Sequence, residues 1–171
     1  MEQQLYEEAM GLLEAGRAEE ADQLVASRLE AAEQAYGRED VRWAKQAFEV
    51  AQFLVARKSA AEARALLEAA CLAAWESDAD RVHLLTIQLN LGEICLYMGD
   101  LSAAEEHLEA TVQGRAAHFG EEHPAYAFGL EAHADLLLAQ REVGPAKDKV
   151  EVAERILRAE NHPRLSGVLV L

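Results

Sequence analysis

The segment Leu91–Ala104, LGEICLYMGDLSAA, carries the pattern that decides the fold. Its small residue Gly92 stands three residues before Cys95, its turn residue is Gly99, and Ala104 follows that turn by five residues. The same register occurs four times along the chain, with anchor alanines spaced 42, 41 and 42 residues apart. The anchors are Ala21, Ala63, Ala104 and Ala146. An internal repeat of this length predicts a stack of similar supersecondary units.

Four more columns of residues hold this register in all four copies. Twelve residues before each anchor stands a small residue, namely Ala9, Ala51, Gly92 or Ala134, and three residues after that one stands Leu12, Leu54, Cys95 or Leu137. A turn residue precedes each anchor by five positions (Gly16, Lys58, Gly99 and Arg141), and an apolar residue follows it by four (Val25, Leu67, Leu108 and Val150). Small residues let two helix axes approach closely, and larger apolar side chains fill the space around the contact. Each copy therefore predicts a helical hairpin.

The composition also indicates an all-α fold, since alanine and leucine supply 58 of the 171 residues and only three are proline. Alanine and leucine lose little conformational entropy in a helix. Short turns and polar breaks delimit eight predicted helices, at 3–15, 18–35, 41–57, 60–75, 81–98, 101–118, 125–141 and 145–159. Each hairpin has an apolar face that it cannot bury alone, so neighbouring hairpins are expected to stack.

The register resembles the tetratricopeptide repeat (TPR). The residues that carry the resemblance are Leu5, Ala9 and Leu12 with Ala21, and Leu91, Gly92 and Cys95 with Ala104. The long period, with His123-Pro124-Ala125-Tyr126-Ala127 and His162-Pro163, is similar to the kinesin-light-chain class. The resemblance implies a right-handed superhelix, or solenoid, of four hairpins with a partial fifth, in a single domain over 1–171. The repeats would span approximately 1–39, 40–80, 81–122 and 123–161, with a partial cap at 162–171.

Charge and motifs narrow the classes of function. The net charge of −15, from 31 acidic and 16 basic residues, disfavours nucleic acid and anionic membrane surfaces as partners. No apolar run reaches the roughly 18–20 residues of a membrane-spanning helix, and the first residues lack the pattern of a secretory signal. Cys71 and Cys95 are expected to be buried free thiols in a reducing cytoplasm. The sequence contains no nucleophile-elbow, phosphate-loop or metalloprotease motif, so we expect neither an enzyme nor a cofactor.

Histidines and tryptophans are expected to have structural roles. His118 and His123 flank two glutamates, but they are not spaced as a pair on one helix face, and the family resemblance implies that His123-Pro124 begins a helix. His133 is expected in the packed interior. Trp43 and Trp75 are expected to wedge between adjacent repeats. We therefore expect no metal site.

In TPR arrays the first helix of each hairpin lines the concave surface, and this assignment is carried over from the resemblance. Helical spacing then selects the side chains that face the groove. They are Tyr6, Glu7, Met10, Lys45, Phe48, Glu49, Gln52, Leu89, Asn90, Glu93, Tyr97, Phe128, Glu131 and Asp135. The set combines aromatic and aliphatic anchors with more carboxylates than bases, which predicts binding of a basic, partly apolar peptide or protein segment. The alternative is that these carboxylates are solvated and only keep the protein soluble.

The predicted function is therefore that of a cytoplasmic adaptor or scaffold that acts through protein–protein interaction. Two alternatives stay open, namely a self-associating structural module and a regulatory or sensor fragment of a larger signalling protein. The tail Leu165–Leu171 is apolar and uncharged. It allows three interpretations: a short cap, a fragment of a longer array, or a homodimer through the C-terminal end.

Overall fold

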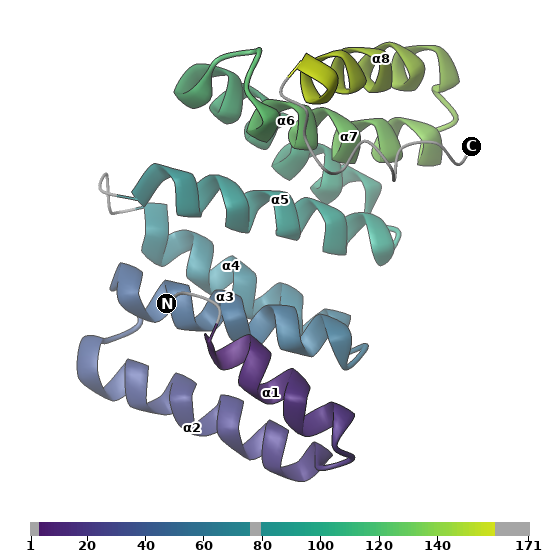
Figure 1. Cartoon of the computed structure of the whole chain (residues 1–171). Coiled ribbons are helices and arrows are strands. Elements are labelled where there is room, and N and C mark those ends of the chain that lie inside the picture. The colour runs from purple at the N-terminus through teal and green to yellow at the C-terminus, as the bar shows by residue number, and fades with distance from the viewer. Residues whose placement is uncertain (1–3, 76–79, 160–171) are drawn as a thin grey trace. The chain divides into compact units, whose positions relative to one another are not determined.

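The computed structural model of the chain describes residues 4–75 and 80–159, without the side chain of Trp75. The predicted cap at 162–171 and the predicted wedge of Trp75 lie outside the described residues. Within them, the regular structure consists of α-helices joined by short turns (Figure 1). The chain divides into two compact units, Met1–Ile87 and Gln88–Leu171, and the division falls inside the fifth helix.

The described residues contain the eight predicted helices, with bounds that lie within two residues of the predicted ones. They are α1 (Gln4–Glu14), α2 (Ala18–Tyr36), α3 (Val41–Ala56), α4 (Ala60–Trp75), α5 (Arg81–Tyr97), α6 (Leu101–Phe119), α7 (Pro124–Ala139) and α8 (Val143–Ala159). The prediction of an all-α chain is confirmed for this part of the molecule. None of these helices is long and apolar enough to cross a lipid bilayer.

Each hairpin turns through one residue whose backbone is left-handed. These residues are Gly16 (φ 74°), Lys58 (φ 61°), Gly99 (φ 78°) and Arg141 (φ 67°), which is the turn column of the sequence register. In every turn the next N–H donates to the carbonyl five residues earlier, at 2.7–2.9 Å, and the acceptors are Leu12, Leu54, Cys95 and Leu137. This pattern satisfies carbonyls that the end of a helix leaves without a partner. The four predicted hairpins therefore share one turn geometry.

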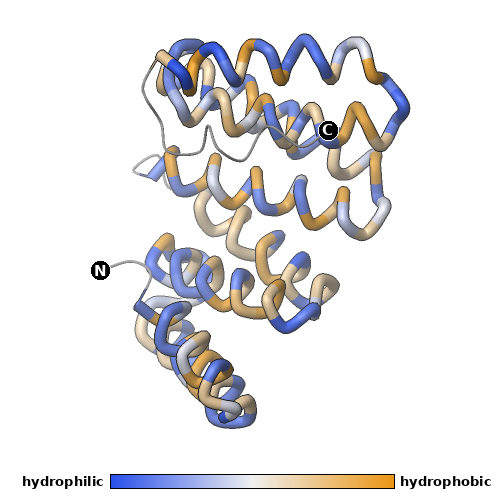
Figure 2. Tube along the Cα trace, turned by 45° about the vertical axis from the view of Figure 1, so that its right-hand side comes forward, coloured by the Kyte–Doolittle hydropathy of each residue, from blue (hydrophilic) through white to orange (hydrophobic). Residues whose placement is uncertain are grey.

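In the first unit, the three helices α1, α2 and α3 share a buried apolar cluster. Its members are Leu5, Ala9, Ala21, Val25, Val50 and Phe53. The anchors Ala21 and Ala63 and the small residues Ala9 and Ala51 are fully buried, as the register predicts. Figure 2 shows hydrophobic and hydrophilic stretches alternating along the helices, as is typical of amphipathic helices that bury one side.

In the second unit, apolar clusters join α5 to α6 and α7, and α7 to α8. The first consists of Cys95, Ala104, Leu108, Ala132 and Leu136. The others centre on Ala127, Leu130, Ala153, Ile156 and Leu157, and on Ala134, Leu137 and Ala146. Cys95 is a buried free thiol in this core, whereas Cys71 in the first unit is a half-buried free thiol.

Gly92 marks the closest approach between α5 and α6. A Cβ atom at this position would lie 2.5 Å from Cγ and 2.6 Å from Cδ2 of Leu108. Leu108 is itself fully buried, so an added methyl group requires a shift of closely packed side chains. At Gly129 in α7, by contrast, the nearest atom to an added Cβ is 3.5 Å away, which is an ordinary contact.

We predict that Gly92→Ala destabilises the protein by roughly 1–3 kcal/mol, because the added methyl group overpacks the contact with Leu108. The matched substitution Gly129→Ala should be neutral or stabilising by up to about 1 kcal/mol, because alanine favours a helix more than glycine does. Urea denaturation followed by circular dichroism measures both free energies of unfolding. Equal effects at the two glycines would contradict this account of the α5–α6 contact.

The turn residues give a second prediction. Lys58→Gly and Arg141→Gly should each stabilise the protein by up to about 1–2 kcal/mol, because glycine adopts the left-handed conformation without the steric cost of a Cβ. Gly16→Ala and Gly99→Ala should have the opposite effect. Lys58→Ala and Arg141→Ala are the controls, since they remove the long side chains but keep the backbone strain. If these alanine variants are as stable as the glycine variants, side-chain effects and not backbone strain determine the stability.

Candidate functional site

The residues predicted to face the partner fall on α1, α3, α5 and α7, and they divide between the two units. Seven lie in the first unit: Tyr6, Glu7, Met10, Lys45, Phe48, Glu49 and Gln52. Seven lie in the second and form what we call the α5–α7 surface: Leu89, Asn90, Glu93, Tyr97, Phe128, Glu131 and Asp135.

Glu49 has a role within the fold of the first unit. It is only 5% exposed, although the sequence places it among the groove carboxylates. Its carboxylate accepts hydrogen bonds from the backbone N–H groups of Leu5 (3.0 Å) and Tyr6 (3.3 Å). These donors belong to the first turn of α1, where backbone N–H groups have no partner inside the helix. The negative charge also favours the positive end of the α1 dipole, so Glu49 attaches α1 to α3.

Lys45 and Phe48 connect α3 to the segment that begins α5. The Lys45 ammonium lies 2.6 Å from the Asp80 carboxylate. Partial burial raises the pKa of Asp80, but the hydrogen bond and charge of Lys45 outweigh this effect and lower it. The Phe48 ring packs edge-on against His83, with 5.4 Å between ring centroids. Both side chains are thus engaged in the packing of the first unit.

The other four predicted residues of the first unit are only partly available to a partner. Glu7 is exposed, whereas Tyr6, Met10 and Gln52 are half-buried. Tyr6 and Met10 pack against the cluster shared by α1, α2 and α3. This set therefore offers one exposed carboxylate, and most of its other side chains support the core.

The α5–α7 surface is more open than the corresponding set in the first unit. Tyr97 is 75% exposed, the most exposed large hydrophobic side chain in the described residues. Glu93 precedes Tyr97 by one turn of α5 and is also exposed. On α7, Phe128, Glu131 and Asp135 have the spacing of a single helix face. Leu89 and Phe128 reach partly into the core of the second unit.

Asp135 differs from the other exposed carboxylates. Neighbouring side chains shield it partly from water, and this partial burial raises the pKa of the Asp135 carboxyl group. Among the described residues it has no hydrogen bond or ion pair that would offset this effect. A cation brought next to such a carboxylate favours its charged form. Asp135 is therefore the residue of the α5–α7 surface with the clearest electrostatic preference for a basic group.

Arg115 is a polar core residue that the sequence did not reveal. It is only 6% exposed, and its Nη1 donates to the carbonyl of Ala125 at the start of α7 (2.8 Å). Burial lowers the pKa of the guanidinium, and the charge of Glu93 partly offsets this. The only signal in the sequence is position, since Arg115 continues the buried row Ala104, Leu108 and Thr111 of α6.

The histidines do not form a metal site within the described residues, where no group of His, Cys, Asp or Glu side chains is arranged to hold an ion. His123 caps α7, because its Nδ1 accepts the N–H of Ala125 (3.0 Å), and Pro124 is the first residue of that helix. The histidine ring also stacks on Phe119. His133 on α7 is half-buried, whereas the sequence predicts a place in the packed interior. Burial and the nearby Lys149 lower its pKa, while Glu109 and Glu105 oppose them.

The role of Glu49 can be tested by its effect on stability. Glu49→Ala should destabilise the protein by roughly 1.5–3 kcal/mol, because it removes hydrogen bonds to a charged group and leaves buried donors unpaired. Hydrogen exchange at the amides of Leu5 and Tyr6 should accelerate as α1 detaches. Glu7→Ala, at an exposed position of α1, is the control and should change stability by less than about 0.5 kcal/mol. Unchanged exchange at α1 in Glu49→Ala would refute the capping role.

No protein-family model matches the chain. No curated protein shows significant similarity to it. The resemblance to TPR proteins therefore rests on the repeat register of the sequence.

Proposed function

We propose that the chain is a protein-interaction module of the TPR type, an adaptor or scaffold that binds a basic, partly apolar protein segment on the first helices of its hairpins. The shared register and turn geometry of the hairpins support a right-handed superhelical stack. The free thiols are in keeping with a cytoplasmic location. Catalysis and cofactors have no part in this proposal.

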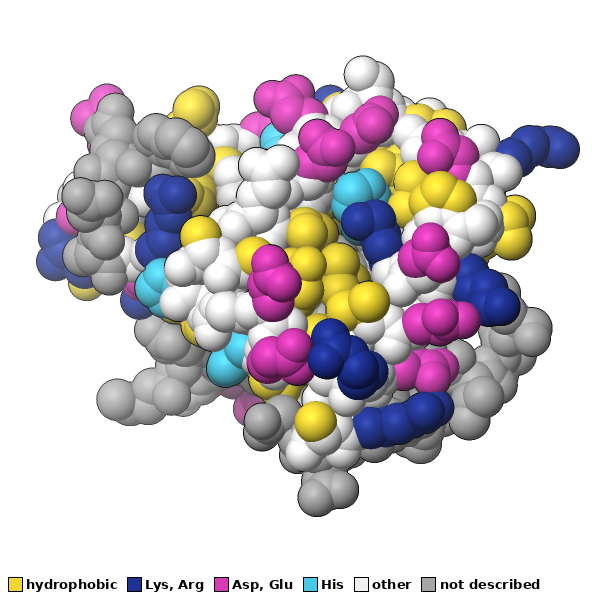
Figure 3. Space-filling model, turned by 90° about the horizontal axis from the view of Figure 1, so that it is seen from above, with side chains coloured by type: hydrophobic (Ala, Val, Ile, Leu, Met, Phe, Trp, Pro, Cys, Tyr) yellow, Lys and Arg dark blue, Asp and Glu magenta, His cyan; other side chains and the backbone are white. Residues whose placement is uncertain are grey.

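The observation that carries the proposal is that the second unit has both an exposed aromatic residue, on α5, and a carboxylate without a partner among the described residues, on α7. Tyr97 supplies apolar area at low entropic cost. Asp135 supplies a carboxylate whose pKa is raised and whose charge has no partner among the described residues. A partner segment that carries both an apolar residue and a Lys or Arg would satisfy both. Figure 3 shows a face on which both acidic and basic side chains border exposed hydrophobic ones.

The binding test reverses one charge at a time. Asp135→Lys should weaken binding of a short Lys- and Leu-containing peptide by about three- to tenfold, because it removes one attraction and adds one repulsion. Asp148→Lys is the matched control, since it makes the same exchange at an exposed aspartate of α8. Fluorescence anisotropy with labelled peptide, repeated at rising salt, measures the affinity and its screening.

A nuclear magnetic resonance titration adds an independent readout. The pKa of Asp135 should fall when the peptide binds, because a nearby cation stabilises the carboxylate. If Asp148→Lys weakens binding as much as Asp135→Lys does, the peptide responds to the overall negative charge. That result would contradict a site on the α5–α7 surface.

A further inference from the structure

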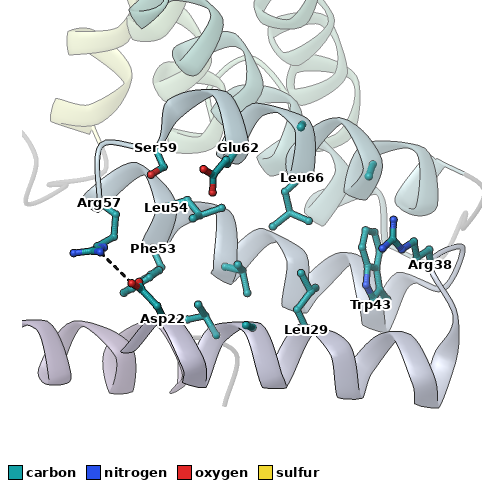
Figure 4. A pocket seen from close by; sticks show the side chains of 15 residues that line it. Asp22, Leu29, Arg38, Trp43, Phe53, Leu54, Arg57, Ser59, Glu62 and Leu66 are labelled. Carbon is teal, nitrogen blue, oxygen red and sulfur yellow. Dashed lines mark hydrogen bonds and ion pairs between the residues drawn. The ribbon is translucent and has the colours of Figure 1, made fainter. Parts of the chain in front are cut away.

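A cavity of about 740 Å³ lies between α2 and α4, with α3 as its floor, entirely within the first unit. Figure 4 shows Asp22 and Leu29 of α2 and Leu66 of α4 reaching toward the same space from opposite sides. We call this cavity the α2–α4 groove. Its volume is within the range of ligand-binding pockets, and its lining is mostly apolar. None of its lining residues belongs to the set that the sequence predicted to face a partner.

The three helices present rows of side chains with the same spacing. The rows are Asp22, Val25, Ala26 and Leu29 on α2; Val50, Phe53 and Leu54 on α3, with Arg57 directly after its end; and Glu62, Ala65, Leu66 and Ala69 on α4. Each row follows the spacing i, i+3, i+4 and i+7, so it runs along its helix for about 10 Å, or two turns. Leu72 continues the row of α4 and is 73% exposed. An apolar trough lined by such rows suits the apolar stripe of another helix.

The charges around the groove are paired except for one. Asp22 and Arg57 form an ion pair of 3.0 Å at one end, and Arg38 near the other end pairs with Glu33 at 2.8 Å. Glu62 lies at the same end as Arg57 (Figure 4). It has no hydrogen bond or ion pair to any described residue. Among the charged lining residues, the one without a partner is therefore the carboxylate of Glu62, at the same end of the groove as Arg57.

We propose that the α2–α4 groove binds an amphipathic helix of a partner protein, with its apolar stripe against the half-buried Leu29, Leu54 and Leu66 and a Lys or Arg facing Glu62. The spacing of the three rows selects a helix, and the unpaired carboxylate selects its basic end. The groove lies on faces of α2, α3 and α4 outside the α5–α7 surface, so this site goes beyond the function proposed above and does not depend on it.

The test uses the full chain and two designed peptides of about 16 residues, or roughly four helical turns. One peptide places leucines at i, i+3, i+4 and i+7 with lysines on the flanks. The other has the same composition with the leucines shuffled, so that no stripe forms. Calorimetric titration measures binding. The striped peptide should bind about tenfold or more tightly than the shuffled one, since only it can bury its leucines together.

Paired variants locate the site. Ala26→Lys and Ala65→Lys place a bulky charge on exposed lining positions of α2 and α4, and each should weaken binding about tenfold or more. Ala31→Lys and Ala61→Lys make the same exchange at exposed positions of these helices outside the lining, and should leave binding unchanged. Glu62→Gln should weaken binding about two- to fivefold, as expected for an exposed ion pair. Circular dichroism checks that every variant keeps its helices.

Several results would overturn the proposal. Equal binding by the lining and control variants, or by the striped and shuffled peptides, excludes a helix in the groove. Self-association that Ala26→Lys abolishes would make a second copy of the chain the occupant. Binding of a monomeric fatty acid without binding of the striped peptide would make the groove a small-molecule site. If Asp135→Lys abolishes striped-peptide binding while Ala65→Lys does not, the peptide binds the α5–α7 surface, and only this inference fails.

Discussion

The hydrogen bond that closes each hairpin determines how the two helices of that hairpin pack against each other. It joins the N–H after the left-handed turn residue to a carbonyl five residues earlier, and it occurs in the same form in all four hairpins. Because it fixes where the second helix starts, it also fixes which residue of that helix meets the first one. The anchor alanines Ala21, Ala63, Ala104 and Ala146 follow this bond by four residues and are at most 1% exposed. A larger side chain at these positions would separate the two helices.

The net negative charge of the chain is concentrated, in its effect on a binding partner, at a few carboxylates that form no ion pair with the described residues. Many of the arginines in the described residues are already paired with a carboxylate, as in Arg17–Glu20, Arg38–Glu33 and Arg57–Asp22. Exposed pairs of this kind contribute little to stability. They do, however, engage the few basic side chains, so the charges that stay uncompensated are carboxylates such as Asp135 and Glu62. An approaching basic segment meets these groups without competition from neighbouring arginines.

The sequence predicted the helices and turns because their signals are local. Small residues, glycines and apolar spacing lie within a few positions of the features that they specify, as at Gly92 and Gly99. The contacts of the candidate site are not local. Glu49 caps a helix that lies more than forty residues earlier in the chain. A helical wheel places it on a face of α3, but it cannot show that the first turn of α1 stands opposite.

The α2–α4 groove was missed for a related reason. Its lining rows have the same apolar spacing as a buried core face, and a sequence alone does not distinguish a face that is covered from one that stays open. The small size of Ala26 and Ala65 is visible in the sequence, but its consequence depends on the distance between two helices. Arg115 presents the reverse case, since a charged residue that would be placed on the surface is buried between α6 and α7.

The residue types at the turns also show a longer period than the hairpin. Left-handed glycine occurs at Gly16 and Gly37 in the first unit and at Gly99 and Gly120 in the second, and a left-handed basic residue follows at Lys58 and at Arg141. Each of these three corresponding pairs is 83 residues apart. At these turns, the described residues therefore repeat in residue type with a period of two hairpins. Duplication of a two-hairpin segment would produce this pattern, and the natural step by which a chain of this kind lengthens or shortens would be a pair of hairpins.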